Sequence, residues 1–213
     1  MSRRVLFITD SLGLPRRRPA PVLWGETYIN RLRARLPHVE TAHIGMPGGT
    51  ITDLHGVAVY YESFQPDIVV LQSGIVDCAP RALSVKESQA LKRLKLRWLT
   101  RPWKKVLRRL RNIAYTTPGE FENTLGKLKA LFPGADFYGI GIVPGCEAYE
   151  AKVPGISARI RDYNEILSRN ISYLSTESLP AAAIAADFHH LTAEGHTILA
   201  DRLVEIVNDS AQS

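Results

Sequence analysis

Ser11, Asp187 and His190 are the residues whose types and spacing favour catalysis. Ser11 directly follows an apolar run, in VLFITDSLG, and the stretch DFHH lies near the other end of the chain. A nucleophilic serine needs a base for its proton and a third group that holds this base in the right tautomer. Asp187 precedes His190 by three residues, so a short turn could bring its carboxylate to one imidazole nitrogen and leave the other for Ser11.

Acyl transfer also needs donors for the negative charge that develops on the carbonyl oxygen. The glycine-rich stretch GMPGGT, residues 45–50, could supply a backbone N–H beside that of Ser11. Taken alone, Ser11 is more simply interpreted as the cap of a turn, because Ser and Asp are common where strands end. DFHH at the far end of the chain favours the catalytic interpretation.

The elements that must position these residues alternate between short apolar runs and longer segments of helical period. This pattern predicts a parallel sheet with helices on both faces. The expected strands are 4–9, 39–44, 67–73, 135–143 and, more weakly, 180–186 (PAAAIAA). The expected helices are 22–36, a short one after Thr52, 120–132, 157–171 and 192–207, with Thr192 as the cap of the last.

Ligands of such open sheets bind outside the carboxyl ends of the strands. The segments that follow the strands are TDSLG, GMPGG, GIVDCAPR and VPGC, and DFHHL precedes the last helix. Nearly all candidate chemistry therefore collects at one edge of the predicted sheet.

These segments resemble the motifs of the SGNH/GDSL hydrolases in the order of that family. TDSLG is similar to its GDSL motif, GMPGGTIT to its second block, QSGIVD to its GxND block, and DFHHLTAEGH to its terminal DxxHLxxxGH. The resemblance spans essentially the whole chain and implies a three-layer α/β/α fold with a flavodoxin-like sheet. It makes Ser11 the nucleophile, His190 the base and Asp187 its orienting carboxylate. Gly48 is the favoured oxyanion donor beside Ser11, with Gly49 as the alternative.

Two residues depart from the family pattern. Thr9 stands in place of the GDSL glycine, and Val76 stands in place of the GxND asparagine, whose side chain is an oxyanion donor. Loss of one such donor costs about 100- to 1000-fold in rate. Asp77 and Arg81 follow closely enough to offer a substitute, and they could instead form a structural ion pair. Asp10 and Gly74 are further candidates for substrate binding.

The remaining histidines and cysteines have simpler interpretations. His189 is a rival base but is expected to line the pocket, because the family Leu follows His190. His196 is expected to be a packing or exposed residue of the last helix. Cys78 is expected to be a small, semi-buried filler, and the two cysteines, Cys78 and Cys146, are too few for a disulfide framework. No HxxxH or paired CxxC spacing indicates a metal, and the predicted chemistry needs no cofactor.

The segment 84–117 carries eleven Lys or Arg residues and one acid, Glu87, within a chain of net charge +6. Leu91, Leu94 and Trp98 share one helical face, and Trp103, Val106, Leu107 and Leu110 share another after a break at Arg101–Pro102. We predict two amphipathic helices inserted as a lid or wall. Alternatively, their apolar faces pack on the domain, or they contact an anionic membrane surface. Nucleic acid is disfavoured, since no recognition motif is present.

With 213 residues, 45% hydrophobic, the chain is expected to form a single domain, 1–213, with this insertion. Without an apolar run of about 20 residues or a signal sequence, we expect an intracellular, cytoplasmic protein. The expected function is hydrolysis of a small ester, with an O-acetyl group on a carbohydrate as the favoured substrate. QSGIVDCAPR also resembles a subgroup associated with bacterial surface-polysaccharide synthesis. The alternatives are an O-acyltransferase with the same triad and a glycan- or membrane-binding protein.

Overall fold

The computed structural model describes residues 3–96, 98, 103–111 and 113–209. Its apolar runs form an all-parallel sheet in the order β2-β1-β3-β4-β5. This is the predicted flavodoxin-like order, and Val, Ile and Leu dominate its buried central strands, as both faces of a covered sheet require. The strands are β1 (Arg4–Thr9), β2 (Glu40–Gly45), β3 (Ile68–Gln72), β4 (Asp136–Ile140) and β5 (Ser172–Leu174).

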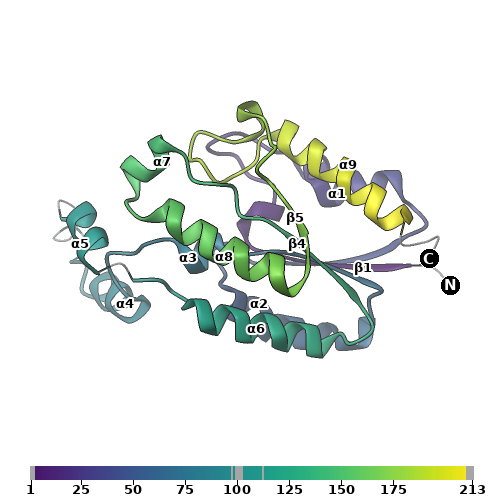
Figure 1. Ribbon diagram of the computed structural model, residues 1–213, viewed down its shortest axis with the longest axis horizontal. Coiled ribbons are helices and arrows are strands. Elements are labelled where there is room, and N and C mark those ends of the chain that lie inside the picture. Colours follow the sequence, from purple (N-terminus) through teal and green to yellow (C-terminus); the bar gives the residue numbers. More distant parts are fainter. Residues whose placement is uncertain (1–2, 97, 99–102, 112, 210–213) are drawn as a thin grey trace.

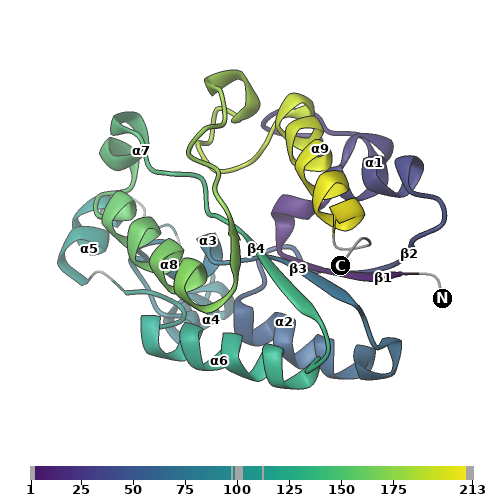
Figure 2. The ribbon, with the colours of Figure 1, turned by 45° about the vertical axis from the view of Figure 1, so that its right-hand side comes forward.

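Helices cover both faces of the sheet, which gives the predicted three layers (Figures 1 and 2). Val5 and Phe7 of β1 pack with α1 (Tyr28–Arg35) and α9 (Ala193–Asp209). Leu6 and Ile8, which point to the opposite face, pack with α2 (Ile51–Ala58), α6 (Pro118–Leu131) and α8 (Ile156–Asn170). The period of two along β1 therefore divides the buried side chains into two cores.

Side-chain caps set the beginnings of several helices. The Thr50 hydroxyl accepts from the Asp53 amide at 3.2 Å, and the Asp53 carboxylate accepts from the Thr50 amide at 2.9 Å. This capping box starts α2 at Ile51, slightly earlier than predicted. Thr192 accepts from the amide of Gly195 at 3.4 Å, in agreement with its predicted role. The predicted helix 22–36 is helical only from Tyr28, after a 3₁₀ turn, η2 (Trp24–Glu26).

The prediction of a strand at 180–186 is wrong. This stretch contains the 3₁₀ turn η4 (Ala181–Ala183), and the edge strand is β5, which pairs with β4. Alanine has little preference for strands, and Ala183 is buried for another reason: it packs beside α9 and accepts from the Thr192 amide. The expected strand 135–143 also ends early, at Ile140. The short elements η1 (Ser11–Gly13), η3 (Val59–Phe64), α3 (Ile75–Cys78) and α7 (Glu147–Lys152) were not predicted.

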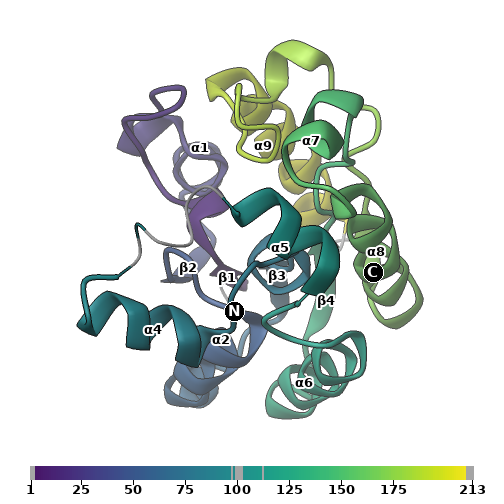
Figure 3. The same ribbon diagram turned by 90° about the vertical axis from the view of Figure 1, so that its left-hand side faces the viewer.

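The predicted basic insertion lies between α3 and α6 and contains α4 (Val85–Arg93) and α5 (Lys104–Arg111). Figure 3 shows both helices in front of one edge of the sheet. A bridge between Arg81 and Ile113 joins the two ends of the insertion, and Arg111 forms a two-bonded ion pair with Glu87 of α4. The predicted break at Arg101–Pro102 lies outside the described residues.

The insertion does not bury most of its apolar faces, as one alternative required. Leu91 and Leu107 are half-buried, but five large apolar side chains are between 50% and 77% exposed, namely Leu94, Trp98, Trp103, Val106 and Leu110. That alternative is therefore wrong for these residues. In the described part of the chain, no helix has both the length and the apolar character needed to cross a membrane.

Candidate active site

Ser11 lies at the point where β1 ends and a tight turn begins. The carboxylate of Asp10 accepts from the Leu12 amide at 2.8 Å and thereby caps η1, which Ser11 opens. Thr9 fits in place of the family glycine because its buried hydroxyl lies 2.9 Å from Nε2 of His43. The turn passes so close to Thr9 that a Cβ on Gly13 would lie 2.5 Å from the Thr9 hydroxyl. This packing places Ser11 at the carboxyl end of a central strand.

Asp187 and His190 lie on a closed loop before α9. Ile184 and Leu191 form a bridge at its base, and the His190 carbonyl accepts from the Ala185 amide at 2.8 Å. Phe188 has a φ of 74°, a conformation that costs energy in a residue with a side chain. Asp187 Oδ1 accepts from the amide of His190 at 3.1 Å, so the carboxylate also organises its own loop.

The structure brings the three predicted residues together. Asp187 Oδ2 lies 2.6 Å from Nδ1 of His190, and His190 Nε2 lies 3.3 Å from the hydroxyl oxygen of Ser11. Burial alone would raise the pKa of Asp187, but the hydrogen bond from His190 and the neighbouring charge of His189 outweigh burial and lower this pKa. Asp187 is therefore an anion at neutral pH, as an orienting carboxylate must be.

The glycine-rich stretch after β2 forms a turn beside this triad. Gly48 has a φ of 72°, which glycine tolerates, and the amide of Gly49 donates to the Met46 carbonyl at 3.0 Å. The amide of Met46 in turn donates to the carbonyl of Thr9, which ties the turn to the end of β1. Because the Gly49 amide is already engaged, Gly48 is the better candidate of the two for an oxyanion donor.

Asp77 is a fully buried residue that holds several segments together. Its carboxylate accepts from the amide of Ile51 at 3.1 Å, the hydroxyl of Thr116 at 2.5 Å and the hydroxyl of Ser73 at 3.4 Å. Burial raises its pKa, although these hydrogen bonds oppose the shift. The carboxylates of Asp10 and Asp77 have no exposed surface, so their place in the fold is a positioning one. The described ion pairs do not include one between Asp77 and Arg81.

Val76 and Gly74 belong to the segment that would supply the third oxyanion donor. Gly74 has a φ of 129°, and a Cβ there would lie 2.6 Å from Ile142. This position therefore requires glycine for packing and for its backbone conformation. Val76 is half-buried on α3, and its carbonyl accepts from the guanidinium of Arg81 at 3.3 Å. Arg81 also stacks over the ring of Tyr115 at 4.8 Å.

His189 and His196 take different positions from His190. His189 stacks on Tyr149 with ring centroids 5.8 Å apart and lies against His190, so it lines the pocket as expected. His196 is fully buried, accepts from the amide of Tyr28 at 3.2 Å and stacks on its ring. Burial lowers the pKa of His196 to about 3, which makes it a neutral packing residue.

The two cysteines are free, Cys78 buried and Cys146 exposed. Burial raises the pKa of the Cys78 thiol, which therefore remains protonated and unreactive at neutral pH. The liganding atoms of Asp187, His189 and His190 lie within 4.8 Å of one another, a spacing that a metal ion could also use. Hydrogen bonds account for this closeness, because both nitrogens of His190 already face Asp187 and Ser11.

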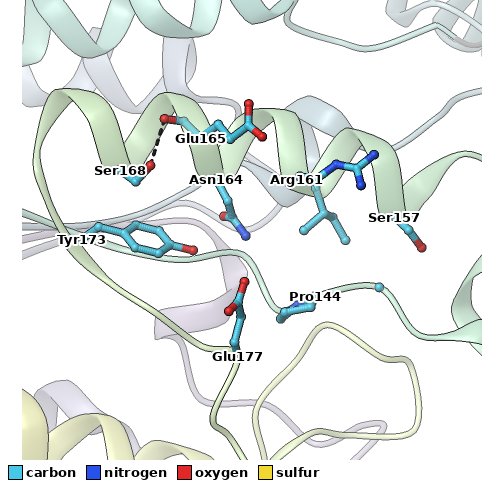
Figure 4. A pocket seen from close by; sticks show the side chains of 10 residues that line it. Pro144, Ser157, Arg161, Asn164, Glu165, Ser168, Tyr173 and Glu177 are labelled. Carbon is cyan, nitrogen blue, oxygen red and sulfur yellow. Dashed lines mark hydrogen bonds between the residues drawn. The ribbon is translucent and has the colours of Figure 1, made fainter.

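Two hollows lie at or beyond this edge of the sheet. One of about 200 Å³ borders Asp187 and His189 and is also lined by Arg81, Arg108, Tyr149 and Lys152. We call it the basic hollow. The other, of about 410 Å³, lies between α8 and the segments after β4 and β5, where Asn164 and Tyr173 point inward (Figure 4). None of the triad residues lines this second hollow.

Sequence reasoning named Arg81, Asp187 and His189 of the basic hollow but gave no site role to Arg108, Tyr149 or Lys152. Arg108 comes from α5, and Tyr149 and Lys152 come from α7. Arg16, on the segment after β1, was missed as well: the residue is half-buried, its three guanidinium nitrogens are buried, and the charge of Asp187 acts on it. No motif contains Arg16, Arg108, Tyr149 or Lys152, and only the fold brings them together with Arg81.

Comparison with known proteins gives structural likeness without close sequence likeness. No family model matches the chain, and no curated protein matches it. A lipase/acylhydrolase from Enterococcus faecalis superposes with a TM-score of 0.69 at 13% identity, covering 98% of this chain and 96% of that one. The esterase EstA from Pseudoalteromonas sp. superposes at 0.60, with 11% identity and coverage of 99% and 100%. The acetyl xylan esterase AlAXEase gives 0.62, with 16% identity and coverage of 96% and 99%.

The class of fold follows from the sheet order and from these likenesses. A five-stranded parallel sheet between two layers of helices, similar over nearly the full length to GDSL-type lipases and esterases, is the SGNH/GDSL hydrolase fold. The sequence-based resemblance to this superfamily is thereby confirmed at the level of the fold. One scaffold hosts many activities, so the reaction must be argued from the site.

Proposed function

We propose that the protein is a serine ester hydrolase that uses Ser11, His190 and Asp187. The observation that carries this proposal is the continuous chain of contacts, 3.3 Å from Ser11 to His190 and 2.6 Å from His190 to Asp187. These residues come from opposite ends of the chain, and a buried turn and a closed loop hold them. A surface serine that only caps a turn needs no such partners.

The reaction would proceed through an acyl-enzyme. Ser11 Oγ attacks the ester carbonyl while His190 Nε2 takes the hydroxyl proton, and the amides of Ser11 and Gly48 stabilise the oxyanion. The bond to the alcohol then breaks, and His190 gives its proton to the departing oxygen. A water molecule, deprotonated by His190, attacks the acyl group, releases the carboxylic acid and restores Ser11.

The proposed substrate is a small ester, with an O-acetyl group on a carbohydrate as the first choice. This choice is supported by the sequence resemblance to surface-polysaccharide proteins and by the likeness in fold to an acetyl xylan esterase. If a sugar hydroxyl replaced water in the second step, the same residues would make an acyltransferase. Product analysis with and without a sugar acceptor distinguishes the two.

A fluorophosphonate probe together with p-nitrophenyl acetate turnover tests the proposal. We expect the native protein to be labelled and active, Ser11→Ala to lose both signals, and His190→Ala to lose turnover. Ser175→Ala is a matched control because Ser175 lies after β5, outside the triad. Unlabelled, inactive native protein of normal stability would contradict the proposal and leave the binding alternative.

Attachment to an anionic membrane surface is a second candidate function, which the exposure of the insertion favours. Trp98 and Trp103 are 67% and 64% exposed within the strongly basic segment, a combination typical of interfacial helices. Sedimentation with vesicles of anionic lipid tests it. Trp103→Ser should reduce binding, whereas Tyr60→Ser, which removes an exposed aromatic from η3, should not. Equal loss in both variants, or no binding, would exclude this role.

A further inference from the structure

The basic hollow beside the triad loop is lined by three basic residues and by one acidic residue. Arg81, Arg108 and Lys152 line it, and Asp187 is the acidic residue that lines it with them. The Asp187 carboxylate already accepts from the ring and the amide of His190. In the described part of the chain, none of the three cations forms an ion pair.

The two guanidinium groups also have unused hydrogen-bond donors. The Nε atoms of Arg81 and Arg108 are buried, and no described group accepts from them. A buried donor without an acceptor is costly, and a guanidinium contains no acceptor, so two guanidiniums cannot satisfy each other. Burial and the charge of Arg81 both lower the pKa of Arg108, as expected for like charges held close together. Such a site becomes complete when an anion with several oxygen acceptors enters it.

The position of the basic hollow connects it to the reaction. Asp187 and His189 form part of its wall, and the ring of His189 lies 4.4 Å from that of His190, centroid to centroid. His189 also stacks on Tyr149, the other aromatic residue that lines the basic hollow. The ring of His189 therefore lies between the basic hollow and His190, the proposed base. A molecule whose ester lies at Ser11 could therefore extend one of its groups into the basic hollow.

The size of the basic hollow limits what it takes. Sites for whole small-molecule ligands usually measure about 300–1,000 Å³, whereas this hollow measures about 200 Å³. It suits one charged group of a larger molecule. The planar guanidinium of arginine can bind two oxygens of a carboxylate or a phosphate at once. A lysine ammonium adds a point charge beside it.

We propose that the basic hollow binds a carboxylate or phosphate group of the ester substrate, so that the protein acts on acylated sugar acids or sugar phosphates. The inference rests on the proposed serine hydrolase function and narrows its substrate class. Arg81 and Arg108 would bind the anionic oxygens, and Lys152, which lines the basic hollow and lies over the ring of Phe188, would add charge.

The test compares three substrates with the same acetyl ester: acetylated methyl glucoside, acetylated methyl glucuronide and acetylated glucose 6-phosphate. We expect kcat/KM of the native protein to be at least tenfold higher for one or both charged sugars than for the neutral one. Arg108→Gln should remove this preference. Arg93→Gln, the same change on an exposed residue of α4 in the same insertion, should preserve it.

The outcomes separate this inference from the proposed function. Equal kcat/KM for all three sugars, or a preference that Arg108→Gln leaves intact, would overturn the anion site while the hydrolase stands. If Arg93→Gln lowers the preference as much as Arg108→Gln does, the effect comes from the overall charge of the insertion, and the inference fails. A preference for only the glucuronide or only the phosphate supports the inference and identifies the group. Absence of both turnover and fluorophosphonate labelling would refute the hydrolase itself.

Discussion

Asp187→Asn is the substitution that separates a catalytic triad from a merely structural loop. In the native protein, Oδ1 of Asp187 accepts from the amides of His189 and His190 at 3.4 and 3.1 Å, and Oδ2 faces Nδ1 of His190 at 2.6 Å. Asparagine can keep its oxygen on the two amides, so the loop is retained. Its NH₂ group would then face Nδ1 and force that nitrogen to accept.

The expected magnitude follows from the tautomer. With Nδ1 unprotonated, the neutral imidazole carries its proton on Nε2, which lies 3.3 Å from Ser11 Oγ and can no longer act as the base. The corresponding substitution in a serine triad lowers kcat by about 10⁴-fold, or about 5 kcal/mol at 1.36 kcal/mol per tenfold change in rate. In the proposed mechanism Asp187 contacts His190 and not the p-nitrophenyl acetate substrate, so KM should change by less than about threefold.

The measurement is steady-state turnover of p-nitrophenyl acetate at pH 7 to 8, with thermal unfolding as a check on folding. Asp162→Asn removes an exposed carboxylate from α8 and is the matched control. A loss of less than about tenfold in kcat for a folded Asp187→Asn protein would refute the reasoning. It would show that the 2.6 Å contact positions the loop and not the base.

Three further predictions test other parts of the site. Val76→Asn, which restores the family donor, should raise kcat by up to about 100-fold if an oxyanion donor is missing, whereas Val76→Leu should not. Burial raises the pKa of Asp10 from 3.8 to about 7, so the contribution of Asp10 to native stability should be greatest below pH 4 and fall as pH rises to 7. Urea unfolding should show Asp10→Asn gaining on the native protein over this range, by up to about 4 kcal/mol at 1.36 kcal/mol per unit. Excess EDTA should leave turnover unchanged, because both nitrogens of His190 are engaged within the triad.

The central strands and the triad could be predicted because each depends on local sequence. The runs in β1 and β3 are apolar at every buried position except the last, Thr9 and Gln72, and the motifs around Ser11 and Asp187 each lie within a few residues. The edge strand could not be identified in this way. β5 has only three residues and is half-exposed, whereas the more apolar stretch 180–186 buries only Ala183 and Ala185, and Ala183 packs beside α9.

The basic hollow could not be predicted because no stretch of sequence contains it. Its charged residues lie after α3, on α5, on α7 and on the triad loop. The helical period correctly predicted helices in the insertion, but it could not show which elements pack against their apolar faces. In the structure Trp103 and Leu110 are exposed. Burial of a helix face depends on which elements pack against it, and that information is absent from the period alone.

Asp77 explains how an insertion with so little buried apolar surface can still present Arg108 beside the triad. Its carboxylate binds Thr116, at the carboxyl end of the insertion, and its carbonyl accepts from the Tyr115 amide at 3.1 Å. The same carboxylate accepts from the first amide of α2, directly after the Gly48 turn. One buried residue therefore fixes both the base of the insertion and the proposed oxyanion turn. Displacement of this carboxylate is therefore expected to disturb the proposed anion site and the proposed oxyanion donor together.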